Sequence, residues 1–110
     1  MAALAMAEYR ANRASDLPRT HPGAILRDDV LPALRLTVKE AAEKLGVSRQ
    51  TLHAILSERS SITAHMAVRL GKLCGNGPEL WLRMQVSYDL WRAERELAEA
   101  VKRIPTLHAA

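Results

Sequence analysis

The chain has 110 residues, of which 48% are hydrophobic, a length that allows one domain with a single modest core. Its formal net charge of +4 favours an anionic partner, and it has two Trp, two Tyr and no Phe, so strand-favouring aromatic residues are scarce. A lone cysteine excludes an internal disulfide, and no apolar run reaches the about 18 residues of a membrane-spanning helix. We therefore expect an all-helical, soluble, cytoplasmic protein.

Most of the net positive charge lies in the middle of the chain. Residues 21–75 contain eight basic and five acidic side chains, a net of +3, whereas residues 76–110 contain five of each. Residues 1–20 carry the remaining +1 and are rich in Ala, Arg and Asn; they are expected to form an N-terminal arm that is a frayed helix, a disordered segment or a segment ordered by a partner. The positive excess therefore lies between the arm and the C-terminal third.

The first predicted helix begins near residue 21. Pro22 suits the first turn of a helix, and Ile25, Leu26 and Val30 give that helix an apolar side. Pro32 is expected to end it, because proline lacks the backbone N–H that an α-helix needs.

Residues 37–63 have the pattern of two short amphipathic helices joined by a tight turn. Thr37 and Glu40 have the spacing of a capping box at the start of the first helix. Gly46 allows the turn, and Ser48 caps a second helix that is predicted to run to about Glu58. The inward-facing positions of the two helices are Val38, Ala41, Ala42, Leu45, Leu52, Ile55 and Leu56. This is a helix-turn-helix pattern.

The outer face of the second helix carries the candidate residues for reading DNA bases. They are Arg49, Gln50, Thr51, His53 and Ser57. Arginine can donate two hydrogen bonds to guanine, and glutamine can pair with adenine in the major groove. The alternative is an ordinary solvated helix face.

A second set of polar residues lies at helix termini and in the loop after the second helix, where backbone amides and positive charges attract phosphate. The candidate phosphate contacts are Thr37, Lys39, Ser48, Arg59, Ser60 and Ser61, with Arg35 as a further one. For each, an ordinary cap or surface charge is the alternative, and Thr37 and Ser48 are capping residues first.

Two more helices are predicted downstream. Thr63 caps a helix that ends at Gly75-Asn76-Gly77, and Cys74 near its end is expected to be a buried structural thiol. Pro78 then opens a long helix that is expected to run to about Val101. The expected domain thus covers residues 21–104, with a tail at 105–110.

Aromatic residues recur at helical spacing on this last helix. Trp81 and Met84 are expected to complete the core of the monomer. Tyr88 and Trp91 lie further along a helix that outruns the core, and they are the predicted dimer contacts.

Catalytic and metal-binding patterns are missing from the sequence. The four histidines show no HExxH or paired-ligand spacing, and one cysteine cannot build a zinc site. We therefore expect no metal, no cofactor and no enzyme activity.

Three segments together resemble the HigA-type antitoxins, a branch of the XRE/Cro-like helix-turn-helix proteins. They are HPGAILRDDVLPAL, TVKEAAEKLGVSRQTLHAILSERSSIT and AVRLGKLCGNGPELWLRMQVSYDLW, which lie within residues 21–92. The HPG opening and the WxxxQxxYDLW ending are more specific than the helix-turn-helix alone. The resemblance implies a five-helix, lambda-repressor-like fold with a long C-terminal helix.

The resemblance also implies a function. Such a protein would dimerise, bind a palindromic operator, repress its own operon and neutralise a RelE/HigB-like toxin that cuts messenger RNA. Two alternatives remain: a free-standing repressor without a toxin, and a toxin-binding module that does not bind DNA. The candidate docking region for the toxin is the N-terminal arm and the first helix, including Tyr9, Arg10, Arg13, Asp28 and Asp29, and an ordinary solvated helix face is the alternative for these residues.

Overall fold

The computed structural model describes residues 19–109, and within this range every regular element is a helix. The elements are α2 (Pro22–Ile25), η1 (Leu26–Val30), α3 (Leu31–Leu34), α4 (Val38–Leu45), α5 (Arg49–Leu56), α6 (Ala64–Cys74), α7 (Pro78–Glu96) and α8 (Ala98–Val101). The expectation of an all-α fold is confirmed. The five predicted helices are present, the first as three consecutive segments, and the short α8 follows the last.

The first helix continues through Pro32, so the prediction that Pro32 ends it is wrong. The segment η1 is a π-helical turn, in which the N–H of Leu31 donates to the carbonyl of Leu26, five residues earlier. Proline lacks an N–H, and in a regular α-helix its ring collides with the carbonyl four residues before it. The wider π turn directly precedes the proline and lets the helix pass it. The helix ends at Arg35, whose φ is 56°.

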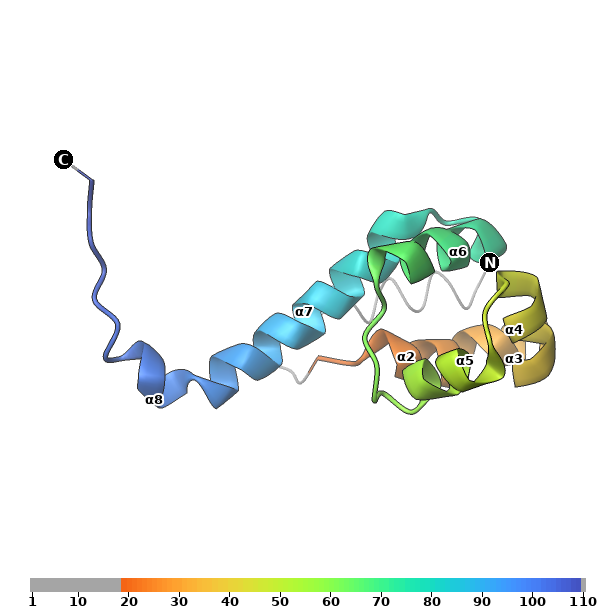
Figure 1. Cartoon of the computed structure of the whole chain (residues 1–110), viewed down its shortest axis with the longest axis horizontal. Helices are drawn as coiled ribbons and strands as arrows, with labels where there is room; N and C mark the ends of the chain where they lie inside the picture. The colour runs from red at the N-terminus through yellow and green to blue at the C-terminus, as the bar shows by residue number, and fades with distance from the viewer. Residues whose placement is uncertain (1–18, 110) are drawn as a thin grey trace.

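Helices α2 to α6 and the first half of α7 enclose one core (Figure 1). Trp81 has no exposed surface, and Met84 is almost fully buried beside the same cluster. Their predicted place in the core is therefore confirmed. Cys74 is also buried, and this burial raises the pKa of its thiol to about 11. Because the thiolate is the reactive form, Cys74 is an inert packing residue, as expected.

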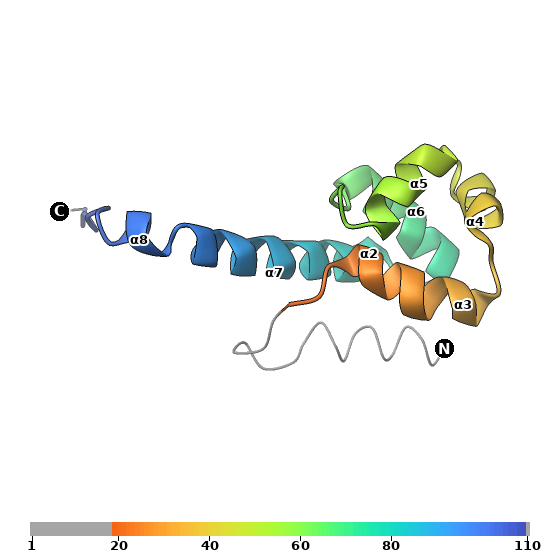
Figure 2. The same ribbon diagram turned by 90° about the horizontal axis from the view of Figure 1, so that it is seen from below.

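Helix α7 leaves the globular part of the molecule halfway along its length (Figure 2). Its buried residues are Leu80, Trp81, Met84 and Gln85, all in its first half. The prediction of one helix reaching Val101 is wrong, because the chain departs from helical geometry at Leu97, where φ is −101° and ψ is 9°. No Gly or Pro marks this break, but helices depend mainly on tertiary packing, and the second half of α7 has little.

No helix among residues 19–109 is long and apolar enough to cross a membrane.

Candidate nucleic-acid interface

The helix-turn-helix is formed by α4, α5 and the turn between them. The turn bends at Gly46, whose φ is 74°, and the N–H groups of Gly46 and Val47 both donate to the carbonyl of Ala42. Arg69 of α6 donates from Nη1 to the carbonyl of Leu45 at 2.7 Å. A charged donor thus satisfies the end of α4, which holds the turn in one geometry.

Helix α5 has the predicted two-sided character. Leu52, Ile55 and Leu56 are buried in the core. The predicted base-reading residues Arg49, Gln50, Thr51, His53 and Ser57 are all exposed. The structure therefore leaves this face of α5 accessible to a large partner.

The C-terminal end of α5 is docked on the first helix. Gly23 of α2 lies so close to the backbone carbonyl of Ile55 that an added Cβ would collide with it. Arg27 of η1 donates from Nη1 to the carbonyl of Leu56 at 2.9 Å and pairs with Asp28 and Glu58. These contacts fix the orientation of α5 relative to the rest of the core.

The roles of Gly23 and Arg27 were not predicted from the sequence. Arg27 and Leu56 are 29 residues apart in sequence, and no helical spacing connects them. The only available signal was a glycine inside an otherwise helical segment, which often marks a close backbone approach.

Two predicted DNA residues are joined at the start of α5. The N–H of Thr51 donates to Oγ of Ser48 at 3.0 Å, and this hydroxyl in turn donates to Oγ1 of Thr51 at 2.9 Å. Ser48 is therefore the N-cap that the sequence predicted. The cap holds the first turn of α5, where Arg49 and Gln50 lie.

A second polar group forms just beyond α5. Nε of Arg59 donates to Oγ of Ser57 at 2.8 Å, and this hydroxyl donates to the carbonyl of Ala54 at 3.2 Å. Ser57, predicted to read bases, is thus used to anchor Arg59, and Arg59 is held close to the end of α5.

Some of the predicted base-reading residues and some of the predicted phosphate contacts line one hollow of about 430 Å³. Gln50 and Thr51 line it from α5, and Ser60 and Ser61 line it from the following loop. Residues that are ten positions apart in sequence thus share one surface. A DNA strand that follows this surface would meet the start of α5 and the loop together.

Thr37 is less suited to phosphate than the sequence suggested. Its hydroxyl accepts from the N–H of Glu40 at 3.1 Å, and its own N–H donates to Oε1 of Glu40 at 3.0 Å. The hydrogen bonds from the backbone and side chain of Thr37 lower the pKa of the Glu40 carboxyl group, so a negative charge lies beside the cap. This charge would repel phosphate. Lys39 and Arg35 are exposed nearby.

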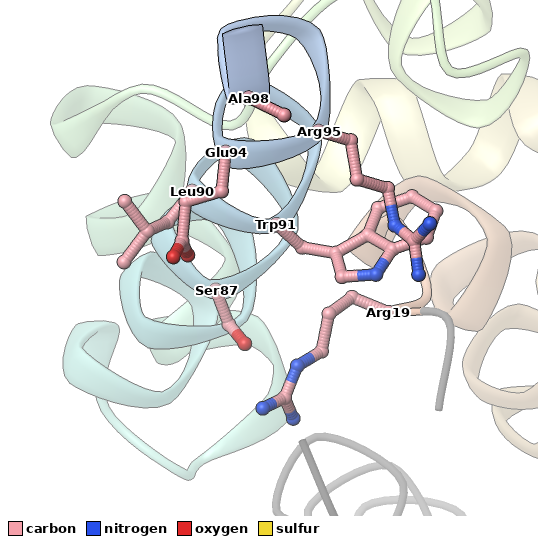
Figure 3. Close-up of a pocket in the computed structure, with 7 residues that line it drawn as sticks. All are labelled: Arg19, Ser87, Leu90, Trp91, Glu94, Arg95 and Ala98. Atoms are coloured by element: carbon pink, nitrogen blue, oxygen red, sulfur yellow. The ribbon is translucent and has the colours of Figure 1, made fainter. Parts of the chain in front are cut away.

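The predicted dimer residues belong to an aromatic cluster on α7. The Tyr88 ring lies 6.3 Å from that of Trp91 and meets the ring of His21 edge-on at 5.0 Å. The guanidinium of Arg95 lies 4.6 Å from the centre of the Trp91 ring. Figure 3 shows these two side chains beside each other. Tyr88 therefore already packs against residues of its own chain, and only part of its ring remains for a dimer contact. The indole N–H of Trp91 is buried and has no hydrogen-bond acceptor among residues 19–109.

The C-terminal extension, residues 86–104, carries a row of exposed apolar side chains that was not predicted from the sequence. Val86 is 59% exposed and Leu90 is 56% exposed on α7, and Leu97 and Val101 continue the row. In Figure 3, Leu90 leaves the helix on a different side from Trp91. The helical spacing of 86, 90, 97 and 101 was readable in the sequence, but only the structure shows that no part of the described core covers it.

Asp28 and Asp29, predicted for toxin docking, lie in η1. The other predicted docking residues, Tyr9, Arg10 and Arg13, fall outside the residues that the structure describes. Across residues 19–109 there is no group of three or more His, Cys, Asp or Glu side chains that could hold a metal ion.

Residues 27–82 match the family model described as helix-turn-helix. Virulence-associated protein I of Dichelobacter nodosus is 38% identical over 82 residues, which cover 74% of this chain and 76% of that relative. Antitoxin HigA-1 of Vibrio cholerae is 33% identical over 85 residues, which cover 77% of this chain and 80% of that protein.

Solved structures of the same family have the same fold. The Pseudomonas aeruginosa antitoxin HigA, solved with the higBA promoter, is 32% identical and superposes with a TM-score of 0.77. The match covers 84% of this chain and 100% of that one. Proteins of this kind are helix-turn-helix regulators and antitoxins and not enzymes. With its capped α4–turn–α5 unit and these matches, the chain belongs to the HigA-type branch of the helix-turn-helix family.

Proposed function

We propose that this protein is a cytoplasmic antitoxin that binds operator DNA, represses its own operon and neutralises a RelE/HigB-like toxin by direct contact. The main observation behind the proposal is the exposed polar face of α5, a helix that is firmly docked on the core. The similar HigA of Pseudomonas aeruginosa was solved with the higBA promoter, which supports DNA as the partner of the same unit here.

In this proposal α5 lies in the major groove, and its first residues read the bases. Arg49 pairs with guanine and Gln50 with adenine, each contact giving about 1–3 kcal/mol of discrimination. Thr51 contacts a thymine methyl or a phosphate, and His53 lies further along the groove. Ser57 acts through Arg59, which it anchors at 2.8 Å.

Phosphate contacts come from both ends of the helix-turn-helix. Arg59, Ser60 and Ser61 bind DNA phosphates beyond the end of α5. Lys39 binds a phosphate near the start of α4. Ser48 and Thr37 act mainly as caps that hold the two helices in place.

The protein binds a palindromic operator as a homodimer, since one helix-turn-helix makes too few contacts for tight binding. We place the dimer contact on the outer half of α7, at Tyr88 and Trp91 and along Val86, Leu90 and Leu97. Exposed apolar side chains in a row are typical of a contact surface.

The toxin is the second protein partner. Asp28 and Asp29 lie on η1, and their carboxylates suit a basic ribonuclease. We place the toxin contact on this helix and on the N-terminal arm.

An electrophoretic shift assay on the protein's own promoter tests the DNA part. The double variant Arg49→Ala/Gln50→Ala should abolish sequence-specific retardation and keep the helical circular dichroism of the wild type. Arg103→Ala removes one positive charge just after α8, a helix that lies far from α5 in Figure 1, and serves as the control, with wild-type retardation expected. Unchanged protection of the operator by the double variant would show that the recognition face is wrong.

Co-expression with the product of the neighbouring gene tests the antitoxin part. A small basic protein that co-purifies and no longer cleaves messenger RNA is the expected result. If no neighbouring gene product binds while the promoter is still retarded, the protein is a free-standing repressor. If a toxin binds and the promoter is not retarded, it is a protein-binding module.

Sedimentation at micromolar concentration tests the dimer. Trp91→Ala should weaken self-association, and Leu90→Glu should weaken it more, because it places a charge in an apolar contact. Leu107→Glu introduces the same charge in the exposed tail and should leave association unchanged. A wild-type sedimentation profile for both α7 variants would refute this placement.

A further inference from the structure

Two polar side chains are buried beneath the loop that follows α5. Among residues 19–109, Gln85 is 3% exposed and His21 is 4% exposed, and both face the segment 60–62. Buried polar groups are costly unless they are hydrogen-bonded, so their partners indicate what they are for. Neither side chain is accessible to DNA itself.

Gln85 connects the loop to α7. Its Oε1 accepts from the N–H of Ile62 at 2.8 Å, and its Nε2 donates to Oδ1 of Asp89 at 2.9 Å. Because each end of the amide has its own partner, the side chain has one orientation. The backbone of the loop is thereby attached to α7 directly after Ser61.

His21 connects the loop to α2 and α7. Its Nδ1 accepts from the N–H of Gly23 at 2.8 Å, which leaves the proton on Nε2. The imidazole also lies close enough to the backbone of Ser60 for that backbone to raise the pKa of the ring. The ring of Tyr88 packs edge-on against it at 5.0 Å.

The other end of the loop is held by α5 itself. The N–H groups of Arg59 and Ser60 both donate to the carbonyl of Ala54, at 2.9 and 3.0 Å. The loop is therefore attached at both ends, while the side chains of Arg59, Ser60 and Ser61 remain exposed.

We infer that Gln85 and His21 are positioning residues for DNA binding, which hold the backbone of residues 60–62 so that Arg59, Ser60 and Ser61 meet the phosphates. The inference rests on the proposed binding of DNA. It assigns a role in DNA affinity to side chains on α7 and before α2 that never touch the duplex.

An exchange of hydrogen-bonding groups tests the role of Gln85. Gln85→Glu places two carboxylates face to face and removes the donor to Asp89. The double variant Gln85→Glu/Asp89→Asn reverses the donor and acceptor of that bond, and it keeps the acceptor for Ile62 and the net charge. Affinity for the promoter duplex is measured at several salt concentrations, at a temperature where circular dichroism shows all variants folded.

Gln85→Glu should weaken binding by about tenfold. It should also reduce the slope of log K against log salt by about 0.9 for each phosphate that the protein no longer neutralises. The double variant should restore both quantities. A purely structural role would lower the unfolding midpoint and leave the slope unchanged, and that result would overturn the inference. Failure of the double variant to restore the slope would overturn it too.

His21→Asn provides a second variant that does not depend on Gln85. Asparagine can still cap α2 at this position, but it is too short to reach Ser60. The expected result is a reduced salt slope, together with a lower unfolding midpoint because the buried ring that packs against Tyr88 is lost. A wild-type slope for this variant would remove His21 from the inference. If the wild-type protein itself does not bind the promoter, the proposed function fails first, and the inference fails with it.

Discussion

The helix-turn-helix half of the molecule and its C-terminal extension, residues 86–104, place their apolar side chains in opposite environments. In the first, Leu52, Trp81 and their neighbours are buried, and side chains cap the starts of α4, α5 and α6. In the extension, Leu90 and Leu97 are exposed, and α8 has no side-chain cap. Folding of the single chain accounts for the first pattern. The second is typical of a surface that a partner covers.

The largest effect is expected from the core. Trp81→Ala should lower the free energy of unfolding by about 3–5 kcal/mol, because it leaves a cavity where no surface was exposed. Leu90→Ala on the extension should change it by no more than about 0.5 kcal/mol at protein concentrations that keep the chain monomeric. Urea unfolding followed by circular dichroism measures both values. Equal effects of the two variants would show that the extension is packed as tightly as the core.

The next effect concerns the contact between α2 and α5. Gly23→Ala should destabilise the protein by about 1–3 kcal/mol, since the new methyl group would collide with the carbonyl of Ile55. In open space the same change inside a helix would stabilise it by about 0.5–1 kcal/mol. The sign of the shift in the thermal midpoint therefore decides whether the backbones are as close as the structure shows.

Loss of a cap should cost less. Thr37→Ala removes the hydroxyl that accepts from the N–H of Glu40, with an expected loss of about 1 kcal/mol. Thr37→Ser keeps the hydroxyl and should retain most of the stability. Chemical denaturation of the two variants measures the difference. A loss as large in the serine variant would mean that the methyl group, and not the cap, stabilises α4.

The smallest effect is a dependence of stability on pH. Burial lowers the pKa of His21 below its ordinary 6.5, against the opposing effects of Glu58, Asp89 and the backbone of Ser60. The unfolded chain then binds the proton more readily, so stability should fall as pH decreases from about 6.5 and be fully present above it. His21→Asn should lack this component of the pH dependence. A wild-type stability that instead rises below pH 6.5 would contradict the direction of the shift.

Local features of the fold were readable from the sequence. The spacing of Leu52, Ile55 and Leu56 set the inner face of α5, and the caps at Ser48 and Thr63 set where α5 and α6 begin. Each depends on residues within four positions of one another, so a short segment of the sequence is enough to predict it. For the same reason, the exposed set from Arg49 to Ser57 was predictable.

Contacts between residues that are far apart in the sequence could not be predicted and are seen only in the tertiary structure. The bond from Arg27 to Leu56 and the bond from Ile62 to Gln85 each join separate helices or loops, and no spacing predicts them. Their geometry depends on how the helices pack. This packing depends on the shape of the whole core and not on any one segment. The same holds for the passage of the first helix through Pro32 and for the break at Leu97. Sequence alone determined which face of α5 is polar, and packing decided how that face is held.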